Sequence, residues 1–287
     1  MPCMKALSDT HICIIGTGLM GASLALALRG KVRHLHGIDP DPSAAPCFDT
    51  FSSQLHSLYN ADVIVLAAPI HVILDLLPQV GAFAAAGALI TDLGSVKAPI
   101  IAAMEGLPPR VQAVGGHPMC GKELSGAAAA EATLYQGCTF ALCKAERTSQ
   151  TALAFMESLI YAVGGQPLHL AAAVHDQAVA HISHLPYLLS VALMLDAAAA
   201  ADETFWQLAS SGFRDTSRLA SSDVTMMGDV VTGNRAALLQ ALADYRAQIE
   251  RLQTLLAAED DSALRAALET ARQARQAWLL YRERRKA

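Results

Sequence analysis

Short apolar runs, many of them rich in β-branched residues, recur along the first half of the chain and alternate with stretches of helical periodicity. The runs that we expect to form strands cover residues 11–15, 33–38, 62–68, 88–92, 111–114, 139–143 and 166–170. Runs without a polar face are typical of strands that are buried on both sides in a parallel sheet. Residues 40–59 are irregular and polar, and we expect a short helix with connections there. The pattern predicts an α/β fold with a doubly wound, mainly parallel sheet.

The pattern changes at about Ala171, where glycine-punctuated strands give way to helix. We expect helices over residues 175–200, 235–258 and 262–284. The second of them carries an apolar stripe at the helical period, formed by Leu238, Leu242, Tyr245, Ile249, Leu252 and Leu256. These helices have more apolar surface than one small bundle buries, so we expect a homodimer. We therefore predict two domains, an α/β domain over residues 1–170 and an all-α domain over 171–287.

The bulk properties exclude several classes of protein. The net charge of −5 gives no general attraction to nucleic acid. The apolar run 185–201 is interrupted by Pro186 and Asp196, so we interpret it as a buried helix and expect no membrane association. We recognise no signal peptide, because glycines break the first apolar run. No C-x-x-C pair or Cys/His metal spacing occurs, so we expect a reduced, cytoplasmic protein without a metal site; its cysteines are Cys3, Cys13, Cys47, Cys120, Cys138 and Cys143.

The first strand-like run leads into Gly16-Thr17-Gly18-Leu19-Met20-Gly21 and then into a helix. This strand, G-x-G-x-x-G and helix order is the dinucleotide-binding fingerprint. Gly16 permits a tight turn, Gly18 lets the backbone approach a pyrophosphate, and Gly21 lets the helix pack closely on the strand. The helix N-terminus offers N–H groups and partial positive charge to phosphates. We expect Thr17, Leu19, Met20 and the three glycines to bind a dinucleotide; a purely structural glycine turn is the alternative.

Asp39 ends the second strand, 18 positions after Gly21. This is close to the offset of about 20 residues expected for the carboxylate that binds the adenosine ribose. A carboxylate there would repel a 2′-phosphate, which favours NAD over NADP. A turn aspartate before Pro40 is the alternative. Ala68 and Pro69 close the next strand-like run and complete the expected cofactor-binding set.

Two polar turns follow predicted strands, at the end of the sheet where ligands bind in doubly wound folds. One turn contains Ser95, and the other contains His117 between a glycine and Pro118. An imidazole with a pKa near about 6.5 can take a proton from an alcohol while a hydride leaves the same carbon. The alternatives are a loop histidine bonded to the backbone and a serine that caps a helix.

A Ser/Gly-rich junction over residues 209–223 places Arg214 and Arg218 four residues apart. Two guanidinium groups in such a junction can present a fork of donors to a carboxylate. The alternative is a helix cap at Asp215 with two surface arginines.

Six segments follow one another along the chain: GTGLMGASLA, ADVIVLAAP, TDLGSVK, GGHPMCGKELSG, HDQAVAHISHLP and ASSGFRDTSRLASSD. In this order they resemble the prephenate/arogenate dehydrogenases of tyrosine biosynthesis over nearly the whole chain, and GGHPM, SHLP and GFRDTSR are specific to that family. We expect a compact, single-activity form, with no chorismate mutase region before the first domain and no regulatory extension after Ala287.

The resemblance implies an NAD-binding Rossmann domain followed by a helical dimerisation domain. It implies that His117 is the catalytic base and that Ser95 is its hydroxyl partner. It also implies that His184 lines the substrate site and that Arg218 holds a substrate carboxylate, with Arg214 nearby. The implied reaction is the NAD-dependent oxidative decarboxylation of prephenate and/or arogenate to 4-hydroxyphenylpyruvate and/or tyrosine.

Three alternatives remain open beside this reading. The first keeps the fold but uses 4-amino-4-deoxyprephenate as substrate. The second is a β-hydroxyacid dehydrogenase, since GTGLMG resembles the glycine loop of that family. Those enzymes need a lysine on the interdomain helix, where this chain has His175, Asp176 and Gln177. The third is a non-catalytic NAD-binding module; the joint presence of Ser95, His117, His184 and Arg218 argues against it.

Overall fold

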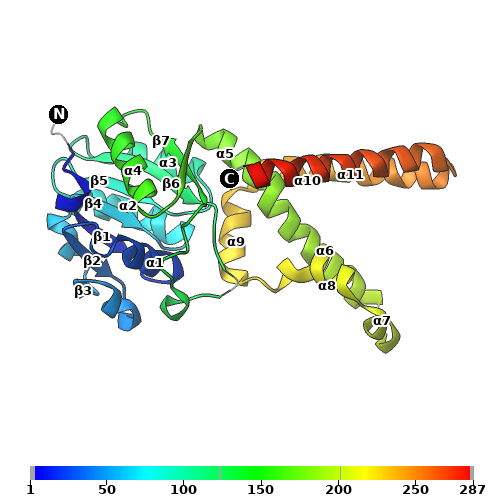
Figure 1. The fold of residues 1–287 in the computed structure, drawn as a ribbon, viewed down its shortest axis with the longest axis horizontal. Helices are drawn as coiled ribbons and strands as arrows, with labels where there is room; N and C mark the ends of the chain where they lie inside the picture. The colour runs from blue at the N-terminus through cyan, green and yellow to red at the C-terminus, as the bar shows by residue number, and fades with distance from the viewer. Residues whose placement is uncertain (1–3, 123, 201, 285–287) are drawn as a thin grey trace. The chain divides into compact units, whose positions relative to one another are not determined.

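A sheet of eight strands, counted within residues 4–122, 124–200 and 202–284 that the computed structural model describes, organises the first part of the chain (Figure 1). Its strands are β1 (His11–Ile15), β2 (His34–Ile38), β3 (Thr50–Ser52), β4 (Val63–Leu66), β5 (Leu89–Asp92), β6 (Gln112–Pro118), β7 (Thr139–Lys144) and β8 (Gln166–His169). They lie in the order β3-β2-β1-β4-β5-β6-β7-β8, and all neighbours are parallel except β6 and β7. The predicted doubly wound, mainly parallel sheet is confirmed.

Helices cover both faces of this sheet (Figure 1). On one face, α1 (Leu19–Leu28) and α4 (Gln150–Ala162) bury their apolar side chains in one core cluster. On the other face, α2 (Ile70–Phe83) and α3 (Ala98–Glu105) form a second cluster. The central strands contribute side chains alternately to the two clusters, which explains why their sequences show no polar face.

Two strand predictions need correction. The segment 40–59 contains not only the short helices η2 (Pro42–Cys47) and η3 (Leu55–Asn60) but also β3, a three-residue edge strand beside β2. Its Thr-Phe-Ser sequence has no strand pattern of its own, so the pairing with β2 decides it. Strand β6 also runs beyond the predicted end at residue 114 and places His117 within the strand, opposite Ala141 of β7.

A chain of helices follows the sheet: α5 (Ala172–Val179), η5 (Ala180–His184), α6 (Leu185–Ala200), α7 (Glu203–Leu208), α8 (Ser211–Ser217), η6 (Arg218–Ser221) and α9 (Val224–Gly233). The predicted single helix over 175–200 is interrupted, because η5 is a turn of π-helix. It ends two residues before Pro186, which has no N–H and whose ring clashes with the carbonyl four residues earlier in a regular α-helix. A π turn at this point is a common way to accommodate such a residue.

The stretch Ala172–Ala200 is, among the described residues, the one helix long and apolar enough to cross a membrane by length and composition. Its most apolar window has a mean hydropathy of 1.6, and 28% of that window is buried. The interpretation of the run 185–201 as a buried helix is therefore wrong for the single chain: only Leu185 and Ser190 of α6 are buried, and Leu195 is 68% exposed. The cytoplasmic location stays a prediction.

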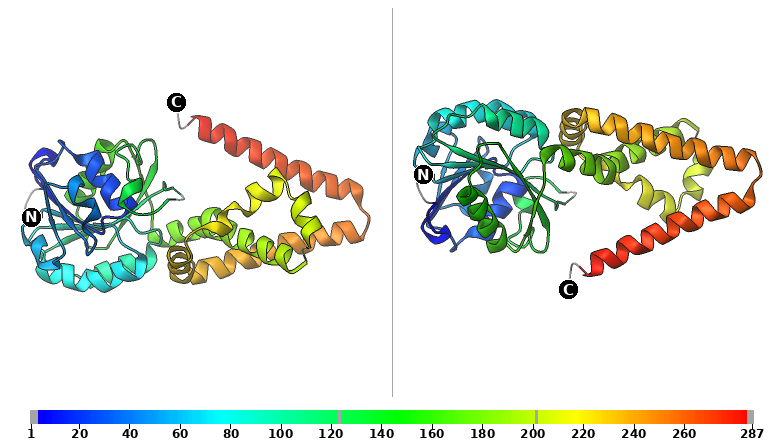
Figure 2. Two further views of the ribbon diagram at one scale, coloured as in Figure 1. Left: turned by 90° about the horizontal axis from the view of Figure 1, so that it is seen from below. Right: turned by 90° about the horizontal axis from the view of Figure 1, so that it is seen from above.

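The chain divides into two compact units, Met1–Arg235 and Ala236–Ala287. The second unit is formed by α10 (Arg235–Ala257) and α11 (Asp261–Arg284), which diverge from the turn that joins them (Figure 2). The helices expected over 235–258, from its apolar stripe, and over 262–284 are both confirmed. Apolar side chains on both remain exposed in the single chain, among them Tyr245, Ile249, Leu256, Trp278, Leu279 and Tyr281. The domain boundary expected at residues 170/171 stays a prediction.

Candidate active site

The glycine turn joins β1 to α1 at the centre of the sheet, where the strand order reverses between β1 and β4. Gly16 has a φ of +90°, and a Cβ there would lie 2.5 Å from the carbonyl oxygen of Ala67. A Cβ on Gly21 would lie 1.9 Å from the Gly16 oxygen, so this glycine allows the close packing of helix and turn. Gly18, by contrast, faces open space and caps α1 without a side chain. The three glycines therefore have distinct roles, and the first N–H groups of α1 have no side-chain cap.

Asp39 lies directly after β2, beside this turn. Its Oδ2 accepts a hydrogen bond of 2.7 Å from the backbone N–H of Thr17, and its Oδ1 accepts one from Asp41. Ala68 and Pro69 lie on the other side, since a Cβ on Gly16 would lie 3.0 Å from the Ala68 nitrogen. The structure thus brings the predicted cofactor-binding residues together around one turn.

A buried ion pair, Asp92–Lys97, lies at the carboxyl ends of β5 and β6. The Nζ of Lys97 donates to Asp92 and to the carbonyl oxygen of Gly116, the latter at 2.6 Å. The other carboxylate oxygen of Asp92 accepts from the Gly116 N–H at 3.1 Å, and both charged side chains are 0% exposed. The pair fixes the backbone of Gly116, the residue before His117.

His117 begins a chain of hydrogen bonds that leads to a second buried carboxylate. Its Nδ1 lies 2.8 Å from Nε2 of His175, and Nδ1 of His175 lies 2.7 Å from Oδ1 of Asp176. An ionised carboxylate only accepts, so His175 carries its proton on Nδ1 and accepts at Nε2. His117 must then donate from Nδ1, which leaves its Nε2 as the basic nitrogen.

The Asp176 carboxylate is itself held by the start of α3. It accepts hydrogen bonds of 2.7 Å from the backbone N–H groups of Lys97 and Ala98. Burial opposes ionisation of Asp176, but the hydrogen bonds from His175 and from these two N–H groups outweigh it and lower the pKa of the carboxyl group. Asp176 therefore stays ionised, as the tautomer assignment requires.

The same cluster includes His184 through the buried side chain of Asn234. The amide nitrogen of Asn234 donates to the backbone oxygen of Asp176 at 2.7 Å and contacts Nδ1 of His184 at 3.1 Å. A neutral His184 that accepts at Nδ1 carries its proton on Nε2. It then presents a hydrogen-bond donor, in contrast to the acceptor on His117.

Both site histidines are held in the neutral form. Burial, and then the electrostatic influence of Lys97, His175 and His184, lower the pKa of His117 well below its usual value. Burial lowers the pKa of His184 to about 4, although Asp176 acts in the opposite direction. At neutral pH the site therefore combines one unprotonated acceptor with one neutral donor.

Ser95 and Arg214 make no hydrogen bond to this cluster in the described part of the chain. Ser95 lies half-buried in the turn between β5 and α3. Arg214, on α8, forms an exposed ion pair of 3.0 Å with Asp215, and Arg218 is exposed at the start of η6. Such an exposed pair contributes little to stability. The roles expected for these three residues stay predictions.

Sequence reasoning missed His175, Asp176, Asn234 and the Asp92–Lys97 pair as parts of this arrangement. The adjacent His175 and Asp176 are visible in the sequence as a histidine followed by an acid at a helix start. Nothing local connects them to His117, which lies 58 positions earlier.

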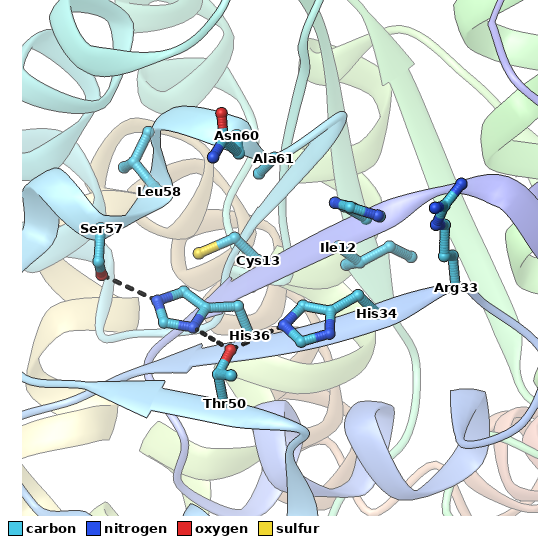
Figure 3. Close-up of a pocket in the computed structure, with 11 residues that line it drawn as sticks. Ile12, Cys13, Arg33, His34, His36, Thr50, Ser57, Leu58, Asn60 and Ala61 are labelled. Carbon is cyan, nitrogen blue, oxygen red and sulfur yellow. Dashed lines mark hydrogen bonds between the residues drawn. The ribbon is translucent and has the colours of Figure 1, made fainter.

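A cavity of about 490 Å³ lies elsewhere, at the amino ends of β1 and β2 (Figure 3). His34 and His36 line it, and both hydrogen-bond to the Thr50 hydroxyl at 2.8 Å. The glycine turn follows the opposite, carboxyl end of β1. This cavity is therefore separate from the predicted dinucleotide site.

Comparisons with known proteins agree on one family. A model of the prephenate dehydrogenase nucleotide-binding domain matches residues 24–168, and a model of the prephenate dehydrogenase dimerization domain matches residues 171–270. The prephenate dehydrogenase of Bacillus subtilis is 29% identical over 287 residues, covering 94% of this chain and 76% of that protein.

Two solved structures are similar over almost their whole length. Prephenate dehydrogenase from A. aeolicus, in complex with hydroxyphenyl propionate and NAD⁺, has a TM-score of 0.89 and 26% identity, covering 95% of this chain and 99% of that one. Synechocystis arogenate dehydrogenase has a TM-score of 0.82 and 33% identity, covering 93% and 99%.

Proposed function

Because the chain belongs to the prephenate dehydrogenase family and is therefore an oxidoreductase, we propose that it catalyses the NAD-dependent oxidative decarboxylation of prephenate, arogenate or both, in tyrosine biosynthesis. The observation that carries the proposal is the hydrogen-bonded chain from Asp176 through His175 to His117. It leaves a basic nitrogen on His117, near the carboxyl ends of the strands where the dinucleotide is expected.

The glycine turn and Asp39 fit NAD. Gly18 leaves open space where a pyrophosphate would approach the uncapped start of α1. Asp39 lies beside the turn as the expected ribose ligand, and its negative charge would repel the 2′-phosphate of NADP. The A. aeolicus relative is described in complex with NAD⁺, which supports the same choice. When bound, NAD accepts the hydride that leaves the substrate.

Two glycine variants separate cofactor binding from folding. Gly18→Ala is expected to raise the KM for NAD at least about tenfold without lowering the melting temperature, because its Cβ meets only the space reserved for the pyrophosphate. Gly21→Ala is expected to destabilise the fold by about 1–3 kcal/mol, because its Cβ would lie 1.9 Å from the Gly16 oxygen. Thermal unfolding and NAD titration measure both effects. Equal loss of stability in the two variants would contradict this division.

In the proposed reaction, Nε2 of His117 takes the proton of the substrate hydroxyl while a hydride leaves the ring carbon that carries this hydroxyl. The ketone formed on the ring then loses the ring carboxylate as CO₂, and the ring becomes a phenol. His175 acts as a positioning residue, since it fixes which nitrogen of His117 is free. His184 offers its Nε2–H to an oxygen of the substrate. Ser95 is proposed to hydrogen-bond the substrate hydroxyl or His117.

Replacing His175 tests its positioning role. His175→Asn is expected to lower kcat about tenfold, as one hydrogen bond worth about 0.5–1.5 kcal/mol is lost. It should also shift the acid limb of kcat/KM to higher pH, because His175 is one of the groups whose electrostatic influence lowers the pKa of His117. His175→Gln serves as the conservative comparison. A lower kcat with an unmoved pH profile would indicate a merely structural role.

Arg218 is proposed to bind a substrate carboxylate, with Arg214 as a weaker contributor. The experiment that tests the whole proposal measures NADH formation from prephenate, arogenate and 4-amino-4-deoxyprephenate, with wild type, Arg218→Ala and Arg214→Ala. Loss of a charged hydrogen bond of about 1.5–3 kcal/mol predicts a KM raised by about 10- to 150-fold in Arg218→Ala. No NADH from any of the three substrates would refute the proposed activity, and the kcat/KM ratios identify the preferred substrate.

We also infer that the protein acts as a homodimer. The exposed apolar side chains of α10 and α11 and the match to a dimerization domain support this inference. Sedimentation of the purified protein tests it.

A further inference from the structure

Two cysteines oppose each other at the end of the ladder between β6 and β7. The antiparallel register ends with Pro118 opposite Phe140. If this register is continued, two residues after Pro118 and two residues before Phe140, Cys120 lies opposite Cys138. This arrangement is not part of the proposed reaction, and nothing in the sequence pattern pointed to it.

The backbone geometry at this pair suits a covalent bond. Met119 donates to the Thr139 oxygen at 2.8 Å, so the neighbouring Cys120–Cys138 pair is of the type without hydrogen bonds, in which Cα atoms lie about 4.5 Å apart. A disulfide requires a Cα separation of about 4.4–6.8 Å. The chain turns at Cys120, whose N–H donates to Pro118, yet the two thiols share a hydrogen bond.

The two thiols of this pair differ from each other, and Cys138 differs from the two buried cysteines, in the direction of the pKa shift. The shared hydrogen bond raises the pKa of Cys120, the donor, and lowers that of Cys138, the acceptor. Burial raises the pKa of Cys13 to about 12 and that of Cys143 to about 11. Cys138 is also partly exposed, so it is the thiol of this pair that is the more ready to ionise and react.

We propose that Cys120 and Cys138 form a reversible disulfide when the protein meets a peroxide. The Cys138 thiolate attacks one oxygen of hydrogen peroxide, the O–O bond breaks, and hydroxide leaves and takes up a proton to become water. The sulfur of Cys120 then attacks the resulting sulfenic acid, forming the S–S bond and releasing a second water. The two thiols lose two electrons in total, and the peroxide is reduced to two waters.

The bond closes a segment that already contacts the cofactor turn. The Tyr135 hydroxyl donates to the Met20 oxygen at 2.7 Å, and the Glu131 N–H donates to the Ser23 hydroxyl at 3.0 Å. Cys120 also follows His117 by three positions. Oxidation therefore links the chain after the catalytic base to the segment that holds the first turn of α1, and it is expected to slow turnover.

The test treats the purified full chain with hydrogen peroxide and measures intact mass, free thiols and turnover before and after dithiothreitol. The expected result is a loss of about 2 Da and of two free thiols, with a peptide that joins Cys120 to Cys138 and a turnover that dithiothreitol restores. Cys138→Ser and Cys120→Ser should not form this link. Turnover of each variant is compared with its own untreated rate.

Cys47→Ser is the matched control, because Cys47 is also partly exposed and packs against the same core cluster. It should oxidise and recover as the wild type does. Cys3 lies outside the described residues, and the peptide map monitors it directly. A link that involves Cys3 or Cys47, or two unchanged thiols at positions 120 and 138 after treatment, would overturn the proposal. Because mass is read independently of activity, the outcome does not depend on the proposed substrate.

Discussion

Replacing His117 with asparagine is expected to lower kcat by about 10²–10⁴-fold, the range typical for loss of a general base. The reason is that Nε2 of His117 is the basic nitrogen left free by the hydrogen-bonded chain to Asp176. An asparagine side chain keeps a polar group near His175 but cannot accept the substrate proton. NAD affinity should remain close to that of the wild type, since the glycine turn lies on other elements of the sheet.

Steady-state kinetics and NAD titration measure this prediction. His169→Asn is the matched control, because His169 is a partly exposed histidine at the end of β8 that pairs with Glu157 at 2.6 Å. It should leave kcat unchanged. A kcat for His117→Asn within about threefold of the wild type would remove His117 from the role of base.

The pH profile of the wild type follows from the same environment. Protonation of His117 destroys the base, so kcat/KM falls as the pH drops through its pKa. Because burial and the electrostatic influence of Lys97, His175 and His184 lower that pKa well below its usual value, the fall should begin well below pH 6.5.

Replacing Lys97 with methionine is expected to reduce the free energy of unfolding by about 3–5 kcal/mol, the cost of leaving a buried charge without its partner. Both side chains of the Asp92–Lys97 pair are 0% exposed, so water cannot replace the lost ammonium group. The carbonyl oxygen of Gly116 also loses its donor. Burial already raises the pKa of Asp92, which shows how unfavourable an isolated charge is at this position.

Urea unfolding followed by circular dichroism measures this effect. Lys122→Met is the matched control, because Lys122 pairs with Glu131 where both side chains are partly exposed. That change should cost no more than about 1 kcal/mol. In the double variant Asp92→Asn/Lys97→Met, which has no buried charge at this pair, part of the lost stability should return. A single variant as stable as the wild type would contradict this account of the pair.

Local patterns in the sequence determined much of this fold. The apolar run of β1, the three glycines and the start of α1 are adjacent in the chain, and each role follows from backbone conformation or close packing within a few residues. The periodic apolar stripe of α10 predicted that helix for the same reason. The position of His117 near the end of a strand also followed from neighbouring residues, although antiparallel pairing with β7 extends that strand further.

Only the tertiary structure decided what surrounds His117. His175 and Asp176 reach it across 58 positions, and Asn234 joins the cluster from the end of α9. Likewise, Cys120 and Cys138 are partners only because β6 and β7 pair in one register. The physical reason is that a hydrogen bond or thiol contact depends on positions within a few tenths of an ångström, which long-range packing sets. Local hydrophobic patterns specify which elements form but not which side chains meet.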